Sequence, residues 1–241
     1  MSEQITATYI DSMGSDLSVV NAARVSFGKT SEWETNDWSY WDKDEGVEVW
    51  DTDKTLSERD TKLINYLAKH NHISPFGHAF VSLHVKAPIF VARQLVKHKF
   101  LRWNEISRRY VDSDPEYYTP ILREAITDKK QGSGCEIGNP LLDQVIYQQQ
   151  IESTKQYRYL LKVGVCEEQA RIVLPLNSMT EWYWSGSLDA FADMCRLRLK
   201  TDTQYETRLV AQQIHDIIFP RFPVSWEALV GGEFSVNQTK D

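Results

Sequence analysis

The spacing of apolar residues along the chain predicts mostly helices, with a few strands. Apolar side chains that recur every three to four residues share one side of a helix, and those that alternate with polar ones share one face of a strand. Helical spacing occurs over seven segments: 16–27, 57–70, 89–98, 141–164, 166–175, 187–200 and 203–220. Residues 5–10 are rich in β-forming side chains, and residues 79–87 alternate as a half-buried strand does. Many helices with a few strands predict an α+β fold in a single domain spanning residues 1–241.

Residues with strong preferences for helix ends mark several of these boundaries. Ser57 and Ser187 can cap the N-termini of the helices that follow them. Pro88 suits the first turn of the next predicted helix. Gly164 can end the long helix before it, and Pro175 stops the short one.

An acidic, tryptophan-rich segment, residues 31–54, interrupts the periodic pattern. It carries nine carboxylates and four tryptophans and keeps no sustained period. We interpret it as an inserted loop or a small hairpin. Scattered acidic residues usually mark a solvated surface, which favours a solvated acidic excursion. The tryptophans leave open a segment that folds back onto the body or forms an interface.

Composition and charge narrow the classes of function. The 241 residues include 27 Lys+Arg and 34 Asp+Glu, a formal net charge of −7, which disfavours general binding to nucleic acid or anionic membranes. The three cysteines are scattered without metal-ligand spacing, and the first residues lack the basic and apolar blocks of a signal peptide. No apolar run approaches the ~20 residues of a membrane span. We therefore expect a cytoplasmic protein with no membrane partner and no specific nucleic acid.

Residues 97–110, KHKFLRWNEISRRY, are basic within this acidic chain. The stretch holds six basic residues: Lys97, His98, Lys99, Arg102, Arg108 and Arg109. Lys and Arg at this density bind phosphates through charge-assisted hydrogen bonds, and Gln94 just upstream can add a polar contact. Two plainer interpretations remain open, a solvated basic face and a helical ion pair between Glu105 and Arg109. The composition indicates a phosphorylated ligand but not the reaction.

Two arginines stand in apolar surroundings, Arg171 in QARIVLP and Arg198 in CRLRLK. A buried guanidinium needs a partner because burying an unpaired charge is costly. The residues alone leave two partners open, a carboxylate of the chain or an anion or polarised carbonyl of a ligand. No metal-binding spacing, GxGxxG, GxxxxGK[ST] or GxSxG motif occurs, so a metal, a Rossmann or P-loop site and a serine hydrolase are not expected.

The basic stretch resembles the signature of flavin-dependent thymidylate synthases, which is Arg-His-Arg, seven residues, then Ser, with Asn-Glu before the Ser and Arg-Tyr after it. The matching positions are Lys97-His98-Lys99, Asn104-Glu105, Ser107 and Arg109-Tyr110. Further passages resemble the same family: 21–27, 72–78, 80–94, 170–177 and 182–198. Two departures stand out: both signature arginines are lysines, which lack the planar fork of Arg, and Gly77 stands where many members have Glu.

The resemblance implies an activity and a fold. Members of the family convert dUMP to dTMP, with the carbon taken from methylenetetrahydrofolate and reducing equivalents from NADPH through a bound FAD. They are homotetramers with active sites at subunit interfaces, and their fold is a sheet flanked by helices. They use no cysteine nucleophile, so the cysteines here need no catalytic role. Segment 31–54 resembles an insertion relative to shorter members.

The resemblance also assigns roles to residues. The residues it places at FAD are Ser74, Lys97, His98, Lys99, Glu105, Ser187, Asp189 and Asp193. Those it places at dUMP are Gln94, Lys97, Glu105, Ser107, Arg108, Arg109, Arg171 and Arg198, with Arg109 and Arg171 the natural phosphate partners. The residues closest to the chemistry are Arg198, Ser107 and His72. Arg198 would draw the pyrimidine toward its N3 anion, Ser107 would orient the ring, and His72 would lie near the flavin.

A second hypothesis belongs to another class of function. A chain with the same frame that has lost catalysis would be a nucleotide- or nucleic-acid-binding protein. Such a protein would bind with a steep salt dependence and show no dUMP turnover. The negative net charge and the presence of Ser107 and Arg198 favour the enzyme.

Overall fold

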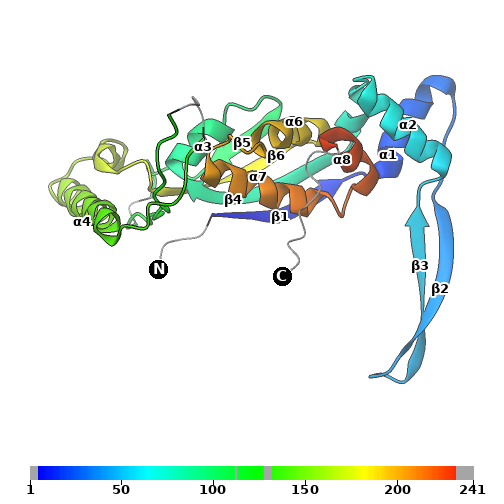
Figure 1. Cartoon of the computed structure of the whole chain (residues 1–241), viewed down its shortest axis with the longest axis horizontal. Coiled ribbons are helices and arrows are strands. Elements are labelled where there is room, and N and C mark those ends of the chain that lie inside the picture. Colours follow the sequence, from blue (N-terminus) through cyan, green and yellow to red (C-terminus); the bar gives the residue numbers. More distant parts are fainter. Residues whose placement is uncertain (1–4, 112, 128–131, 232–241) are drawn as a thin grey trace.

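The computed structural model describes residues 5–111, 113–127 and 132–231, and within them the central element is an antiparallel four-stranded sheet (Figure 1). Its strands are β1 (Thr6–Met13), β4 (Phe80–Pro88), β6 (Met179–Ser187) and β5 (Leu101–Glu105), in the order β1-β4-β6-β5. Helices α3 (Ile89–Leu95), α6 (Leu188–Arg198) and α7 (Tyr205–Ile218) pack against it. The predicted α+β class, a sheet flanked by helices, is confirmed.

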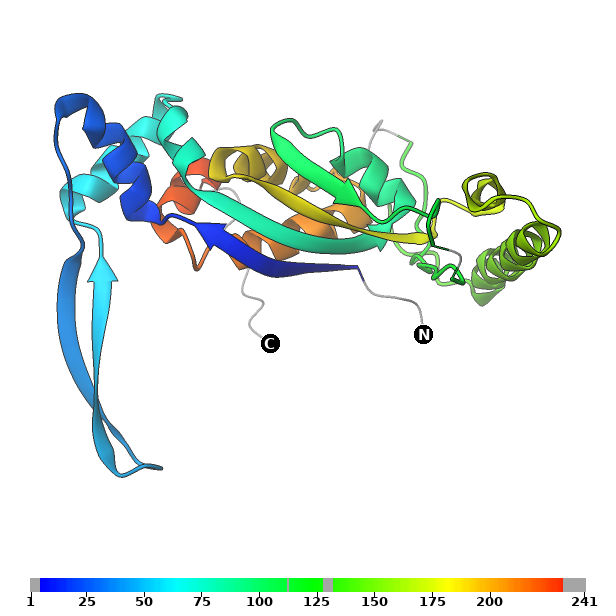
Figure 2. The same cartoon turned by 180° about the vertical axis from the view of Figure 1, so that it is seen from behind.

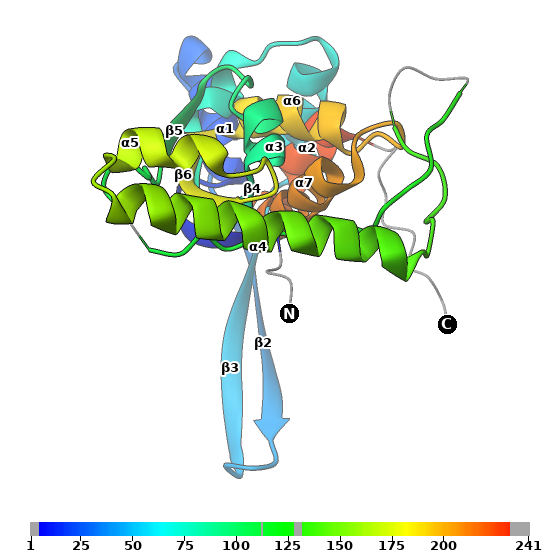
Figure 3. The ribbon, with the colours of Figure 1, turned by 90° about the vertical axis from the view of Figure 1, so that its left-hand side faces the viewer.

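The remaining elements lie at the two ends of this body. At one end are α1 (Asp16–Arg24), η1 (Val25–Phe27), α2 (Glu58–Lys69), η2 (Ser74–His78) and α8 (Pro223–Val230). At the other end are α4 (Pro140–Lys162), α5 (Glu167–Ala170) and η3 (Arg171–Val173), with α4 lying across the end of the sheet (Figure 3). No helix in the described ranges has both the length and the apolar character needed to cross a bilayer.

The alternating sequence of β4 explains how the sheet and helices join. Val81, Leu83 and Val85 are fully buried, whereas the polar residues between them are half-buried. Across the ladder Leu83 pairs with Trp184 and Val85 with Trp182, so large aromatic side chains complete the same buried face. Each such burial contributes about 1.5–3 kcal/mol, which makes this layer the main source of stability.

Most of the predicted helices are confirmed, but only some of the expected caps form: Ser187 is at the N-cap position of α6 without a side-chain capping hydrogen bond. The Ser57 hydroxyl accepts a hydrogen bond from the Asp60 amide at the start of α2, and Gly164, with a φ of +90°, follows the last turn of α4. Helix α3 ends at Leu95, three residues before the predicted end, because the chain turns through Phe100, with a φ of +65°, into β5. The pattern had not predicted β5, β6 or α8.

The sequence is compatible with either an inserted loop or a small hairpin over residues 31–54, and the structure shows the hairpin. Strands β2 (Glu34–Asp42) and β3 (Val47–Thr55) pair antiparallel along their whole length and project from the body beside α1 and α2 (Figures 1 and 2). The turn closes with Gly46 at a φ of +66°, and the Asp42 carboxylate accepts hydrogen bonds from the amides of Asp44 and Glu45. Nearly all of its side chains are exposed, as expected for an acidic excursion.

A buried carboxylate ties the base of this hairpin to the body. Asp60, 3% exposed, accepts hydrogen bonds from Arg24 Nε at 2.9 Å, Ser31 Oγ at 3.0 Å and Ser57 Oγ at 2.9 Å. Burial alone would raise the pKa of Asp60, but the hydrogen bonds from Arg24 and the two serines outweigh it and hold that pKa below its usual value. Ser31 and Ser57 flank the hairpin, so this network fixes both of its ends.

Candidate functional site

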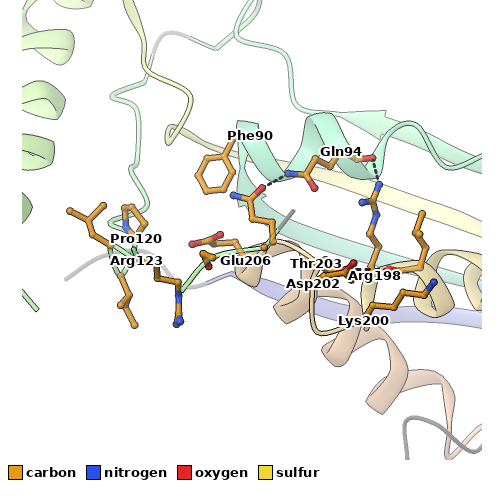
Figure 4. Close-up of a pocket in the computed structure, with 15 residues that line it drawn as sticks. Phe90, Gln94, Pro120, Arg123, Arg198, Lys200, Asp202, Thr203 and Glu206 are labelled. Atoms are coloured by element: carbon orange, nitrogen blue, oxygen red, sulfur yellow. Dashed lines mark hydrogen bonds between the residues drawn. The ribbon is translucent and has the colours of Figure 1, made fainter. Parts of the chain in front are cut away.

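Arg198 lies at the end of α6, on the wall of a cavity of about 810 Å³. Its Nε donates a hydrogen bond to Nε2 of His98 at 3.0 Å, and its Nη2 donates to the backbone oxygen of Gln94 at 3.4 Å. Figure 4 shows Gln94 of α3 and Arg198 of α6 meeting at this wall. We call this space the Arg198 cavity. Among the described residues no carboxylate forms an ion pair with Arg198, and its Nη1 has no hydrogen-bond partner.

The geometry requires His98 to be neutral. Nε2 of His98 accepts a hydrogen bond from Arg198 Nε, so the ring's own proton is on Nδ1. The pKa of His98 is lowered from 6.5 to about 4, mainly by burial and secondly by the positive charge of Arg198, while Asp193 opposes the decrease. His98 is therefore an uncharged acceptor near pH 7 that orients the guanidinium without neutralising it.

Both ends of the Gln94 side chain are held within the chain. Its Nε2 donates to Oε1 of Gln204, and its Oε1 accepts from Oγ1 of the fully buried Thr207 at 3.3 Å. Gln204 and Thr207 belong to the start of α7, so α3, α6 and α7 together define one wall of the Arg198 cavity.

The carboxylate of Glu105, at the end of β5, is held from both sides. Thr180 Oγ1 donates to its Oε1 at 2.6 Å, and Trp103 Nε1 donates to its Oε2 at 3.0 Å. Glu105 lines a second space of about 290 Å³, here called the Arg171 cavity, together with Arg108 and Arg171. The proposed helical ion pair between Glu105 and Arg109 is wrong, because Glu105 is in a strand and Arg109 follows in a turn.

Around the Arg171 cavity, some acidic side chains have charged partners, whereas the two arginines have none among the described residues. Two of its acids have cationic partners, Asp114 with Arg158 and Glu116 with Lys86, and the carboxylate of Glu181 lies 3.1 Å from Nε2 of His84. Among the residues that the structure describes, Arg108 donates only to the backbone oxygen of Ser113, and Arg171 only to that of Glu168. Arg171 is exposed, so the expectation of a buried, paired guanidinium fails there. The two arginines keep their full charge for an anion.

Ser107 and Arg109 form a local pair beyond β5. Arg109 Nε donates to Ser107 Oγ at 3.1 Å, and the guanidinium lies 5.1 Å from the ring centre of Tyr110. Arg109 and the signature residues Lys97 and Lys99 are exposed.

His72 and Ser74 lie in a third space, of about 1060 Å³, here called the His72 cavity, formed by α1, η1, α2 and the start of η2. The Tyr66 ring stands edge-on to His72, with ring centroids 6.0 Å apart. Two cations on this wall, Lys29 and Arg59, form no ion pair among the described residues. Cations beside aromatic and aliphatic side chains suit a ligand with both phosphates and a planar ring.

The start of α6 carries the last group of expected site residues. Ser187 is its N-cap, next to η2, which packs against α6. Asp193 pairs with Arg196. Asp189 Oδ1 is buried and accepts no hydrogen bond from any described residue. A buried carboxylate oxygen without a donor is costly unless a ligand supplies one.

The expected site residues thus fall into separate regions of one chain. Gln94, His98 and Arg198 lie together, Glu105, Arg108 and Arg171 lie together, and His72 and Ser74 form a third group. Sequence reasoning missed the residues that hold these groups: Thr180, Gln204 and Thr207. It also missed the polar lining of the Arg198 cavity: Arg123, Lys200, Asp202, Thr203 and Glu206. Nothing in their local pattern marks them, because each becomes relevant only through packing.

Comparisons with known proteins bear on this arrangement. The family described as "Thymidylate synthase complementing protein" matches residues 8–224. A flavin-dependent thymidylate synthase of Thermus thermophilus is 38% identical over 91% of this chain and 73% of its own length. One from Kosmotoga olearia is 37% identical over 92% of this chain and 88% of its own.

Among solved structures, a UMP/dUMP methylase, PolB, from Streptomyces cacaoi bound with 5-Br dUMP superimposes with a TM-score of 0.77 at 28% identity, covering 95% of each chain. Fold, family match and identity agree over nine-tenths of the sequence. The chain belongs to the flavin-dependent thymidylate synthase family.

Proposed function

We propose that this protein is a thymidylate synthase that converts dUMP to dTMP, with methylenetetrahydrofolate as the carbon donor, FAD as the cofactor and NADPH as the reductant. Family membership supports the reaction class, and the methylase PolB supports a uridine nucleotide as substrate. The expectations of a homotetramer, a single domain with a hairpin insertion and a cytoplasmic location belong to the same proposal.

The observation that carries the proposal is the state of Arg198. A half-buried guanidinium with a neutral histidine beside it and no ion pair among the described residues keeps its charge for a ligand. A uracil ring placed against Nη1 would have the negative charge of its N3 and carbonyl oxygens stabilised. That charge makes C5 more nucleophilic without a covalent bond to the enzyme.

Other residues would bind and orient the nucleotide. Arg108 and Arg171, whose partners are backbone carbonyls, suit the phosphate, and Arg109 can join them. Gln94 is immobilised by Gln204 and Thr207 and can present one amide hydrogen or lone pair to the ligand. Ser107 would orient the pyrimidine.

The residues around the His72 cavity fit FAD. Lys29 and Arg59, which line this cavity, suit a pyrophosphate. His72 and Ser74 lie on the same wall. Asp189 is outside the lining, at the start of α6 beside η2, and its orphaned oxygen needs a donor such as a ribose hydroxyl or a ring N–H. When bound, FAD supplies the hydride chemistry that no amino-acid side chain offers. The protein itself would position FAD and the substrate and supply the electrostatic environment of the reacting atoms.

The separation of these groups supports a site shared between copies of the chain. Substrate, cofactor and folate must meet at one place, yet the groups expected to bind them line three cavities of one chain. An assembly that brings the Arg198, Arg171 and His72 cavities of different copies together would join them. This is the physical argument for a site shared between copies; the number of four copies comes from the family resemblance.

A second candidate reaction is the methylation of UMP. It is favoured by the likeness to PolB, whose title gives both UMP and dUMP. The two activities differ only in the 2′-hydroxyl of the substrate.

The test loads the protein with FAD, reduces it without oxygen, adds methylenetetrahydrofolate and either dUMP or UMP, and measures the methylated product by mass spectrometry. We expect dTMP from dUMP, and a loss of about 10²–10³-fold in kcat for Arg198→Ala with FAD binding unchanged. Arg208→Ala, which removes an arginine outside the three cavities, is the matched control. Product from UMP alone would favour the second reaction, and binding without any product would favour the nucleotide-binding hypothesis.

A further inference from the structure

The hairpin β2–β3 stands apart from the body. Among the described elements its strands pack extensively only against each other, and the views in Figures 1 and 3 agree that it extends away from the sheet and helices. Two strands of nine residues reach about 30 Å. An isolated two-stranded hairpin is marginally stable in water, so this one gains from a surface that covers it.

Both faces of the hairpin carry large apolar side chains. The register pairs Ser39 with Trp50 and Trp41 with Glu48, which puts Trp41 and Trp50 on one face, 62% and 68% exposed. Trp38 and Tyr40 are on the other face, with ring centroids 5.5 Å apart. Exposed tryptophans on a ribbon are typical of contact surfaces rather than of solvated loops.

Charge decides what kind of surface can cover these rings. Residues 34–55 carry eight carboxylates and two lysines, a net charge of −6 in a chain of −7. Two hairpins would repel each other, and nucleic acids and anionic membranes would repel the hairpin as well. The partner surface must be cationic with exposed apolar groups.

The chain itself has such a surface at the end of α3 and the start of β5. We call it the α3–β5 surface; its exposed residues are Arg93, Val96, Lys97, Lys99, Phe100 and Arg102. Phe100 is 82% exposed and has a φ of +65°. This backbone conformation is costly for a bulky residue, and such strain is typical of residues with a functional contact. In the described part of the chain none of these four cations forms an ion pair.

We propose that the hairpin of one copy packs on the α3–β5 surface of a second copy. The contact is made between copies because the hairpin points away from the body that carries its own α3 and β5 (Figure 2). A reciprocal exchange of two hairpins closes a two-fold dimer, so the contact does not propagate into fibres. This inference does not depend on which reaction the enzyme catalyses, although Lys97 and Lys99 are also expected to contact FAD.

The first test uses wild-type protein. Unlabelled and ¹⁵N-labelled copies are mixed, equilibrated and treated with a zero-length carbodiimide, which joins carboxylates to lysines in direct contact. Mass spectrometry should find mixed-isotope links from hairpin acids such as Asp37 and Glu48 to Lys97 or Lys99. Mixed-isotope links that reach other lysines but never this surface would overturn the proposal, as would links found only within one copy.

The second test measures association by analytical ultracentrifugation over a range of protein concentration. Glu34 and Thr55 are paired neighbours, so a Gly-Ser-Gly linker can replace residues 34–55 without disturbing the body. We expect this deletion, and Trp41→Ala with Trp50→Ala, to raise the dissociation constant of the dimer at least tenfold, with the melting temperature of the dissociated protein at low concentration unchanged. An unchanged dissociation constant would refute the contact.

The third test asks whether charge specifies the partner. Asp37 and Glu48 are on the same face as Trp41 and Trp50. Asp37→Lys with Glu48→Lys should weaken association, and adding Lys99→Glu with Arg102→Glu should restore it. Asp143→Lys with Glu152→Lys makes the same change of charge on α4 and is the matched control. Equal weakening by the control, or failure of the second pair to restore association, would show that the α3–β5 surface is not the partner.

Discussion

The contact between Arg198 and His98 makes a prediction that can be worked out from the structure. Replacing Arg198 by Met keeps the length and the apolar stem of the side chain but removes its charge and its hydrogen bond to Nε2 of His98. Burial alone still disfavours the imidazolium. We therefore expect the pKa of His98 in Arg198→Met to rise above the wild-type value of about 4 yet remain below 6.5.

The magnitude follows from the two contributions. Burial is the larger cause of the low pKa of His98, and the charge of Arg198 is the second. A like charge at hydrogen-bonding distance shifts a pKa by about one pH unit or more, which sets the expected rise. The full difference between 6.5 and about 4 corresponds to at most about 3 kcal/mol, and because His98 is only half-buried we expect about half of that.

The same contact makes stability depend on pH. Unfolded His98 binds a proton as the pH falls through 6.5, whereas folded His98 stays neutral down to about 4. The unfolded state therefore binds more protons in this window, and the stability that His98 contributes is complete above pH 6.5 and lost between 6.5 and 4. Urea denaturation of wild type and His98→Gln across this range measures the loss.

The assay for the pKa is NMR of ¹³C,¹⁵N-histidine, with His98→Gln to assign the signal. Wild-type His98 should show an unprotonated Nε2 and no titration above pH 5. Lys200→Met removes another cation from the wall of the Arg198 cavity and should leave the titration unchanged. A wild-type midpoint near 6.5, or the same midpoint in Arg198→Met, would refute the neutral acceptor and with it the argument that Arg198 keeps its charge for a ligand.

Three further changes test other parts of the structure. Asp60→Asn should lower the free energy of unfolding by about 3–5 kcal/mol in urea, because it leaves a buried guanidinium without its counter-charge; a loss below about 1 kcal/mol would contradict this. Gly186→Ala should cost about 1–3 kcal/mol and speed amide exchange in β5, since a Cβ there overlaps Cδ2 of Leu101; unchanged exchange would show that the approach is not tight. Thr180→Val should lower kcat/KM for dUMP about tenfold at unchanged melting temperature, because it removes the hydrogen bond to one carboxylate oxygen of Glu105. Full activity would show that Glu105 has no role in the site.

Local pattern predicted the elements whose signals are local. Helix α2 has its cap and its apolar stripe within fourteen residues, and β4 alternates without interruption. Strand β5 lacks such a signal: its five residues include an arginine and a glutamate, and it is a strand because β6 pairs with it. The pattern does not predict strand β6 because the order of its aromatic residues gives no clear strand signal. Those residues complete the buried face only once β6 pairs with β4 and β5.

The site shows the same division between local and distant information. A short motif located His98, Glu105 and Ser107, and chemistry alone singled out Arg198. What the motif could not give is the state of these groups. Whether Arg198 is paired, or whether both oxygens of Glu105 are already occupied, depends on Thr180 and other residues far away in sequence.

The hairpin also explains how the proposed phosphate site is compatible with an acidic chain. Nearly all of the negative excess is in residues 34–55, so the body is close to neutral, and among the described residues Arg108, Arg171 and Arg198 line its cavities without a carboxylate partner. Salt screens exposed charges over about 8 Å at physiological ionic strength, and the hairpin extends about 30 Å from its base. Its tip therefore has little effect on the potential at the cavities of its own copy. The net charge of the whole chain does not show that the acidic residues are far from the cavities. An acidic isoelectric point therefore does not argue against a phosphate site when most of the excess carboxylates are in one projecting hairpin.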